Sequence, residues 1–288
     1  MLFYHYFYEM NEDFIDKLLQ EHKSKTGCPS PSEVAGMFKG LLGLLFCDYT
    51  KDNIYTKAQV VVALQRNKMA LIDLLLKLDI EDRTGVNQIA DGFFDRLPVV
   101  HKLLHLDIAA IYDGDPAASS KKEVVRSYPG FYAMAAYRIA HELHLMGVRD
   151  IPRIITEYAH SKTGIDIHPG AIIGQSFCID HGTGIVIGET AAIGNNVKIY
   201  QGVTLGALSV RKKDANNKRH PTIKNNCVIY SGATILGGET VIGKDSIIGG
   251  NVWLTRSVPE GSKIYYQAKM NMDSNGETDT YVFKGFAK

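Results

Sequence analysis

The sequence predicts an α+β protein in which an all-helical N-terminal domain is followed by a parallel β-helix of six-residue repeats. Two observations support this prediction. Apolar residues recur at helical spacing as far as about residue 163, whereas from Ile167 onward aliphatic residues recur every six residues. The change of period divides the chain into a helical domain over 1–163, a β-helix over 164–258 with an interrupting loop at 207–219, and a C-terminal tail over 259–288.

The helical half carries start signals as well as periodicity. Ser30-Pro31-Ser32-Glu33 is a capping box with proline at the first helical position, and apolar residues follow at helical spacing. Similar spacing predicts helices over 57–78, 88–106, 130–146 and 151–160. The residues around Asp113-Gly114-Asp115-Pro116 predict a turn.

The second half repeats with a period of six, which is neither helical nor that of an ordinary strand. The aliphatic positions fall into four runs: Ile167, Ile173, Ile179 and Ile185; Ile187, Ile193, Ile199 and Leu205; Ile223, Ile229 and Ile235; Leu236, Ile242, Ile248 and Leu254. A two-residue slip separates the first run from the second, a polar insertion separates the second from the third, and a one-residue slip separates the third from the fourth. Three such sides make a triangular coil of 18 residues, with the aliphatic side chains inside.

Charge, apolar runs and cysteine spacing exclude several classes of function. The formal net charge of +1 gives no overall basic field for a nucleic acid. The apolar run 34–47 is too short to span a bilayer, and the N-terminal segment lacks the features of a signal peptide, so we expect a cytoplasmic protein without a membrane segment. The four cysteines are scattered without metal-ligand spacing, so we expect no metal and no disulfide framework.

One histidine stands out by its position. His181 lies at the two-residue slip, where the chain leaves the flat side of a coil and a side chain can reach a cleft. A histidine has a pKa close to neutrality, which suits a general base.

Several segments resemble the serine O-acetyltransferases, a family of hexapeptide acyltransferases. The matching segments run in order over about residues 107 to 260. They are Asp115-Pro116-Ala117, Tyr137-Arg138-Ile139-Ala140-His141, Asp166-Ile167-His168-Pro169, Ile179-Asp180-His181-Gly182-Thr183-Gly184, Ile187-Gly188-Glu189-Thr190-Ala191, Gln201-Gly202-Val203-Thr204-Leu205-Gly206 and Arg219-His220-Pro221.

The resemblance implies a left-handed β-helix that transfers the acetyl group of acetyl-CoA to the hydroxyl of L-serine, the first step of cysteine biosynthesis. His181 would be the general base and Asp166 the carboxylate that orients it. Asp115 and Asp180 would take the serine ammonium, and Arg219 with His220 its carboxylate. Glu189 would either hydrogen-bond near the serine or cap a corner.

The resemblance also assigns the donor site and the assembly. Backbone N–H groups near Gly206 would stabilise the oxyanion, and Ser231 and Gly250 would line the acetyl-CoA groove. Family members form trimers or dimers of trimers, with the groove between β-helices.

The chain departs from the family pattern in three places. Ala207 stands where the family usually has a second glycine. The loop that follows is longer and basic, with Arg211, Lys212, Lys213 and Lys218, which would approach the CoA phosphates or remain solvated. The C-terminus does not end in the isoleucine that many members use to bind cysteine synthase, which argues against that partner.

Two alternatives remain open. Another hexapeptide acetyltransferase with a sugar or xenobiotic acceptor would keep His181 without needing the amino-acid clamp. A γ-type carbonic anhydrase would bind zinc through three histidines, for which His168, His181 and His220 are candidates.

Overall fold

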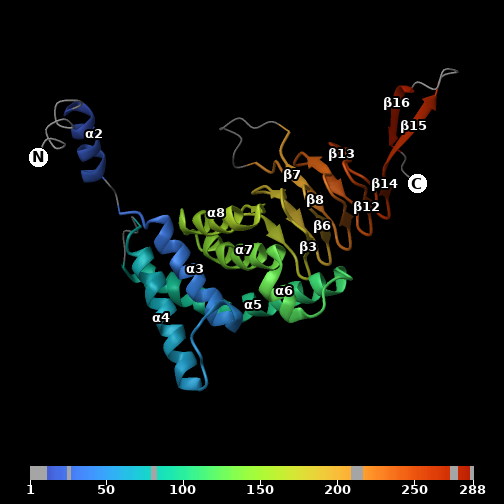
Figure 1. Cartoon of the computed structure of the whole chain (residues 1–288). Helices are drawn as coiled ribbons and strands as arrows, with labels where there is room; N and C mark the ends of the chain where they lie inside the picture. Colours follow the sequence, from blue (N-terminus) through green and yellow to red (C-terminus); the bar gives the residue numbers. More distant parts are fainter. Residues whose placement is uncertain (1–11, 25–26, 79–82, 209–216, 273–277, 286–288) are drawn as a thin grey trace, which may run out of the picture.

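The structure is a computed structural model that describes residues 12–24, 27–78, 83–208, 217–272 and 278–285. Helices fill the first part of the chain, and stacked coils of short strands fill the second (Figure 1). Most of the basic loop, residues 209–216 with Arg211, Lys212 and Lys213, lies outside the described residues.

The described helices agree closely with the sequence periodicity. They are α2 (Glu12–Lys23), α3 (Pro31–Leu45), the 3₁₀ turn η1 (Cys47–Tyr49), α4 (Lys57–Leu75), α5 (Arg83–Gly114), α6 (Lys121–Ser127), α7 (Pro129–Leu145) and α8 (Ile151–Thr163). The capping box is confirmed, because the Ser30 side chain accepts from the Glu33 N–H and the Glu33 carboxylate accepts from the Ser30 N–H at 2.9 Å.

Two helical features differ from the prediction. Helix α5 runs to Gly114, eight residues beyond its predicted end at Leu106, and the short helix α6 was not predicted. The last turn of α5 is held by the β-helix, because the Lys198 Nζ donates to the Gly114 carbonyl at 2.6 Å. A cation at a helix C-terminus satisfies carbonyls that have no partner within the helix, so a contact distant in sequence supports the extra turns.

The strands form three parallel sheets. Sheet A contains β1 (Asp166–Ile167), β4 (Val186–Ile187), β7 (Thr204–Gly206), β10 (Thr234–Leu236) and β13 (Trp253–Leu254); sheet B contains β2 (Ile172–Ile173), β5 (Ala192–Ile193), β8 (Thr222–Ile223) and β11 (Val241–Ile242); sheet C contains β3 (Cys178–Asp180), β6 (Lys198–Tyr200), β9 (Val228–Ile229), β12 (Ile247–Ile248) and β14 (Lys263–Ile264). The chain visits A, B and C in turn, so the three sheets are the sides of a triangular prism of about five coils. This architecture agrees with the left-handed β-helix that the family resemblance implies.

The register confirms the 18-residue coil and locates its irregularities. Val186 pairs with Thr204, eighteen residues further on, whereas Thr204 pairs with Thr234, thirty residues further on. The twelve additional residues do not disturb the stacking on either side, as expected for an insertion between coils. The inward aliphatics are buried: Ile199, Leu205, Ile229 and Ile242 are all 0% exposed.

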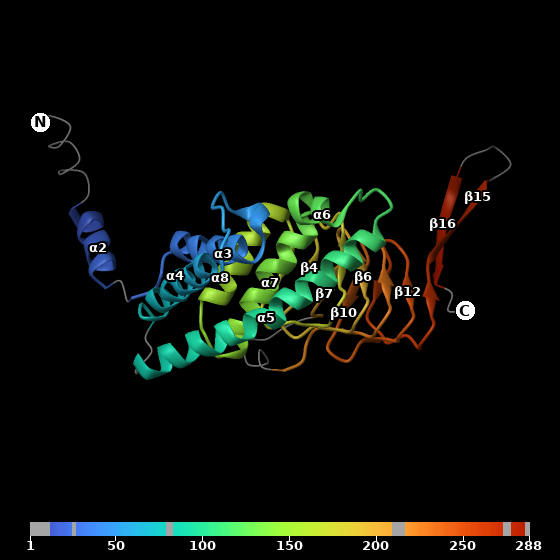
Figure 2. The ribbon, with the colours of Figure 1, turned by 90° about the horizontal axis from the view of Figure 1, so that it is seen from below.

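Buried polar contacts join the two halves. The Arg138 guanidinium on α7 pairs with Asp107 on α5 at 2.9 Å and donates to the Ile173 carbonyl at 2.8 Å. The Asp107 carboxylate in turn accepts from the Phe177 N–H at 2.9 Å. Figure 2 shows α5 running along the helices toward the coils, and it packs against β3. These contacts fix the first coil against the helical domain, which supplies part of the site.

The coils continue beyond the predicted boundary at residue 258, since β14 pairs with β12 in sheet C. Two antiparallel strands, β15 (Tyr266–Met272) and β16 (Thr278–Gly285), then form a hairpin that projects from the last coil (Figure 1). Within the described ranges, no helix has the length and apolar character needed to cross a membrane.

Candidate active site

Most of the predicted site residues lie at two edges of sheet A, together with side chains that were not predicted. At the edge shared with sheet C stand Asp115, Tyr128, Asp180, His181 and Lys198, which we call the His181 corner. At the edge shared with sheet B stand Glu189, Thr190, Lys218, Arg219 and His220, which we call the Arg219 corner. The short strand β4 crosses sheet A from the first corner to the second.

His181 belongs to a two-residue insertion that pushes it out of the prism. Asp180 pairs with Tyr200, twenty residues further on, but Val186 pairs with Thr204 at an offset of only eighteen. The surplus falls between these pairs, where His181 has a φ of 57° and its side chain is 71% exposed. The same left-handed conformation occurs at other corners of the coils, for example at Asn196 and Asn226, so it belongs to the corner geometry. The predicted slip therefore presents an imidazole to solvent.

Asp180 is held between His181 and a lysine. Its Oδ2 lies 2.8 Å from the Lys198 Nζ, and its Oδ1 lies 3.7 Å from the His181 Nε2. Partial burial opposes the charge on Lys198, but the hydrogen bond to Asp180 outweighs it and raises the pKa of Lys198 above its usual value. The buried carboxylate of Asp180 is thus fixed beside the exposed imidazole.

Asp115 stands across a small pocket from these residues. Its Oδ2 accepts from the Tyr128 hydroxyl at 2.7 Å, and its Oδ1 accepts from the Ala117 N–H at 2.8 Å. These hydrogen bonds lower the pKa of Asp115 below its usual value. A pocket of about 220 Å³ is lined by both aspartates and His181. Two carboxylates beside a histidine suit a ligand that carries an ammonium and a hydroxyl.

The Arg219 corner contains an ion pair. The Arg219 Nη2 donates to the Glu189 carboxylate. Partial burial works against the charged form of Glu189, but Arg219 and His168 hold the pKa of this carboxyl below its usual value. Glu189, whose role the sequence left open, therefore anchors the arginine in this chain.

His220 is buried and neutral. It is only 8% exposed, and desolvation together with Arg219 and Lys218 lowers its pKa to about 4. A Cβ placed on Gly188 would lie 2.1 Å from the His220 Cδ2 and Nε2. The ring therefore lies directly over Gly188, and only glycine leaves room for it.

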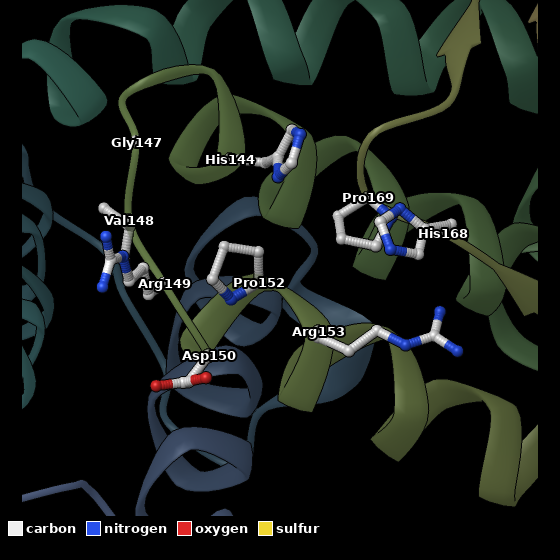
Figure 3. Close-up of a pocket in the computed structure, with 9 residues that line it drawn as sticks. All are labelled: His144, Gly147, Val148, Arg149, Asp150, Pro152, Arg153, His168 and Pro169. Atoms are coloured by element: carbon white, nitrogen blue, oxygen red, sulfur yellow. The ribbon is translucent and has the colours of Figure 1, made fainter. Parts of the chain in front are cut away.

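A second pocket opens beside the Arg219 corner. Figure 3 shows His144, Pro169 and His168 on its wall, with Pro152 and Arg153 below them in this view. Its volume is about 380 Å³. A Cβ on Gly170 would come within 3.2 Å of Glu189, His144 and His168, so these side chains converge behind the Arg219 ion pair.

Asp166, the predicted orienting carboxylate, has other partners in this chain. Its Oδ1 accepts from the Arg153 Nη1 at 3.2 Å. Asp166 also joins Glu157 and His160 in the one group of described residues close enough to hold a metal ion, with ligand atoms within 4.8 Å of one another. Arg153 ion-pairs with both carboxylates of the group, so a cation already neutralises them. The three histidines considered for zinc form no such group among the described residues.

The predicted donor-site residues are divided between the same two edges. Ser231 and Gly250 follow β9 and β12 at the edge that carries His181, and a Cβ on Gly250 would lie 3.2 Å from the Ser231 carbonyl oxygen. Gly206 ends β7, and Ala207 follows it at the edge that carries Arg219. Each edge therefore carries part of the predicted acceptor clamp and part of the predicted donor groove.

Two residues that organise the corners, Lys198 and Thr190, were not predicted as site residues. Lys198 neutralises Asp180. Their separation in the sequence does not predict this contact, because only the stacking of the coils brings the two residues together. Thr190 contacts both members of the Arg219-His220 pair. The sequence offered one signal for Thr190: it directly follows Ile187-Gly188-Glu189, where the chain turns a corner of the coil.

A parallel β-helix of hexapeptide coils with an exposed histidine at one corner defines the hexapeptide acyltransferase class. No protein-family model matches the chain. The plasmid serine acetyltransferase of Synechococcus elongatus is 51% identical over 193 residues, which cover 65% of this chain and 60% of that protein. The serine acetyltransferase of Bacillus licheniformis is 47% identical over 163 residues, covering 57% of this chain and 73% of that protein.

Solved structures agree with these relatives. Entamoeba histolytica serine acetyltransferase 1 in complex with L-cysteine superposes with a TM-score of 0.73 and 37% identity, covering 79% of this chain and 85% of that one. A serine acetyltransferase in complex with CoA superposes with a TM-score of 0.55 and 32% identity over 68% of this chain and 81% of that one. The chain belongs to the serine acetyltransferase family. It spans about three fifths of the length of the first two curated relatives, 60% and 58%.

Proposed function

We propose that this protein transfers the acetyl group of acetyl-CoA to the hydroxyl of L-serine, giving O-acetyl-L-serine and CoA, the first step of cysteine biosynthesis. The observation that carries the proposal is the exposed His181 beside Asp115 and Asp180 in one pocket. Family membership supports both the acceptor and the donor. Because acetyl-CoA is an intracellular thioester, the proposal includes a cytoplasmic place of action.

The chemistry needs one base and no covalent enzyme intermediate. A nitrogen of His181 accepts the proton of the serine hydroxyl as its oxygen attacks the thioester carbonyl. The tetrahedral intermediate carries its negative charge on the former carbonyl oxygen, which backbone N–H groups near Gly206 stabilise. Collapse breaks the carbon–sulfur bond, and the protonated His181 returns its proton to the departing CoA thiolate.

The acceptor clamp in this proposal draws on both corners. Asp115 and Asp180 take the ammonium, while Arg219 and His220 take the carboxylate. One side of a coil has about six residues at ~3.3 Å each, so the two edges of sheet A are separated by roughly 15–20 Å. A serine molecule is much shorter than that. Therefore the His181 corner of one copy must meet the Arg219 corner of another, as a trimer or a dimer of trimers allows.

The donor follows the same division. Ser231 and Gly250 lie on later coils along the edge that carries His181, so a pantetheine arm lying along this edge would bring its thioester to the histidine. Gly206 and Ala207 would line the opposite wall, supplied by the other copy. The complex of a related enzyme with CoA supports acetyl-CoA as the co-substrate.

The proposal also includes a carboxylate that orients the His181 ring. Asp166 takes this role by the family resemblance, which requires its ion pair with Arg153 to open. Asp180 is the carboxylate nearest to the His181 ring, at 3.7 Å. Asp166→Asn should lower kcat with little change in the KM for serine. If Asp180→Asn gives that pattern instead, the two aspartates exchange roles.

L-Cysteine should inhibit by occupying the acceptor site. It carries the same ammonium and carboxylate as serine, with a thiol that meets His181. The complex of the Entamoeba enzyme with L-cysteine supports this expectation. Inhibition should be competitive against serine. Inhibition that saturating serine fails to relieve would place the inhibitor at a separate site.

The decisive experiment is CoA release from acetyl-CoA with a panel of acceptors. L-Serine should be the preferred substrate over D-serine, L-threonine, aminosugars and chloramphenicol. A preferred aminosugar or antibiotic would replace this proposal with the alternative acetyltransferase. Carbon dioxide hydration that depends on zinc would support the carbonic anhydrase instead.

A further inference from the structure

Thr190 is the centre of the hydrogen bonds at the Arg219 corner. Its Oγ1 accepts from the Arg219 N–H at 2.9 Å and from the His220 N–H at 3.0 Å. Its backbone N–H donates to the His220 Nδ1 at 3.0 Å, and its Oγ1 lies 2.9 Å from the same nitrogen. The Lys218 Nζ closes the arrangement by donating to the carbonyls of Thr190 at 2.7 Å and His220 at 2.6 Å.

These contacts determine the tautomer of His220. A backbone N–H can only donate, so the Nδ1 that faces Thr190 carries no proton. The Thr190 hydroxyl has its two acceptor sites filled by the N–H groups of Arg219 and His220, and so its own hydrogen points to Nδ1. The neutral ring therefore carries its proton on Nε2, the nitrogen that lies over Gly188 and that Thr190 leaves available as a donor.

The same hydroxyl sets the course of the backbone through Arg219 and His220. These residues end a twelve-residue insertion, so the coil stacking does not hold them until Thr222 pairs with Ala192 in sheet B. Thr190 lies on the preceding coil and replaces the missing strand pairing with side-chain hydrogen bonds. Removing the hydroxyl would leave two part-buried N–H groups without this acceptor.

We propose that Thr190 is a positioning residue that holds Arg219 and the Nε2-protonated His220 in place for the carboxylate of the acceptor. This inference rests on the proposed function, because it gives those two side chains their ligand. It goes further by assigning carboxylate selectivity to a residue that touches neither the reacting atoms nor the substrate.

The experiment compares L-serine with L-serinamide, which keeps the ammonium and hydroxyl but lacks the charged carboxylate. The measured quantity is the ratio of kcat/KM for the two acceptors in Thr190→Val, Thr190→Ser and the unaltered protein. Valine keeps the shape and loses the hydroxyl. The preference for serine should fall about tenfold in Thr190→Val and stay within about threefold in Thr190→Ser. The KM for acetyl-CoA should stay nearly constant.

A structural defect alone would not give this result. A smaller folded fraction lowers both rates equally and leaves the ratio unchanged. Thr240→Val is the matched control, because it removes another corner hydroxyl, which donates to the Leu236 carbonyl at 2.7 Å. If Thr190→Val fails to fold, Thr190→Ala gives the same comparison with less steric demand.

An unchanged ratio in the folded hydroxyl-less variant would overturn the inference. So would a serine preference that falls equally in Thr190→Ser. Two other failures would point to the proposed function instead: an unaltered protein that does not acetylate serine, and one that accepts serinamide as readily as serine.

Discussion

The two corners of sheet A differ in the way each holds its histidine. His181 is 71% exposed at its side chain and sits in a left-handed turn, whereas His220 is 8% exposed and fixed by Thr190. The first ring has a free face for a reactant. The second has one nitrogen committed and its pKa lowered to about 4, so it is a neutral donor over the working range of pH.

This difference shows how one fold separates reaction from recognition. A general base must exchange a proton with the substrate, which requires a face open to the substrate and a pKa near the working pH. A recognition group must keep one charge state and one orientation, which burial and hydrogen bonds provide. Sequence type alone does not distinguish these uses, because both residues are histidines beside charged neighbours.

The largest expected effect comes from removing the exposed ring. His181→Ala should lower kcat by roughly 10²–10⁴-fold, since it removes the imidazole that lines the pocket with Asp115 and Asp180. Binding of acetyl-CoA should persist, as measured by calorimetry. His22→Ala, at an exposed position on α2 away from the coils, is the control (Figure 1). Near-normal kcat in His181→Ala would remove the distinction between the corners.

The next effect is on acceptor affinity at the other corner. Arg219→Ala should chiefly raise the KM for serine, because it removes the cation that pairs with Glu189. The expected loss of binding free energy is about 2–4 kcal/mol. Steady-state kinetics with serine varied at saturating acetyl-CoA measures this. Arg256→Ala, which removes an exposed arginine, should change nothing. A collapse of acetyl-CoA binding with serine kinetics intact would assign Arg219 to the donor instead.

A smaller effect should follow from crowding the buried ring. Gly188→Ala places a Cβ 2.1 Å from His220, so the ring must move. We expect a rise in the KM for serine of about tenfold and a loss of about 1–3 kcal/mol in unfolding free energy. Gly36→Ala on α3 has open space around the new Cβ and should be neutral or stabilising. Unchanged serine kinetics in Gly188→Ala would show that the position of His220 does not matter.

The smallest effect is the pH dependence of stability. The folded protein holds the pKa of His220 at about 4, below the ordinary value of 6.5, so the unfolded chain binds a proton first as the pH falls. This contribution to stability should be complete above about pH 6.5 and decrease progressively toward pH 4. Burial also lowers the pKa of His141 and His168, which act in the same direction. Urea unfolding at several pH values measures this contribution. The free energy of unfolding should depend less steeply on pH in His220→Gln, and an identical pH dependence would contradict the prediction.

Much of the architecture was readable from the chain. The six-residue spacing predicted the coils, and the two-residue slip predicted the position of the exposed histidine. The capping box at Ser30 fixed the start of α3. The extension of α5 to Gly114 was not readable, because its stabilising cation, Lys198, lies 84 residues away in sequence. The further strand β14 was also missed, because its pairing with β12 follows a shorter coil than the preceding ones.

The sequence by itself determined the period of the coils, their inward aliphatic stack and the chemical types of the site residues. These follow from local spacing and from side-chain chemistry, which neighbours in the chain set. Only the tertiary structure decided which of those residues meet. Stacking coils that are 18 to 30 residues apart brings Lys198 to Asp180 and Thr190 to His220, and it separates the predicted clamp onto two edges of one sheet. Burial then set the charge state of each histidine, because desolvation depends on what surrounds a ring in space.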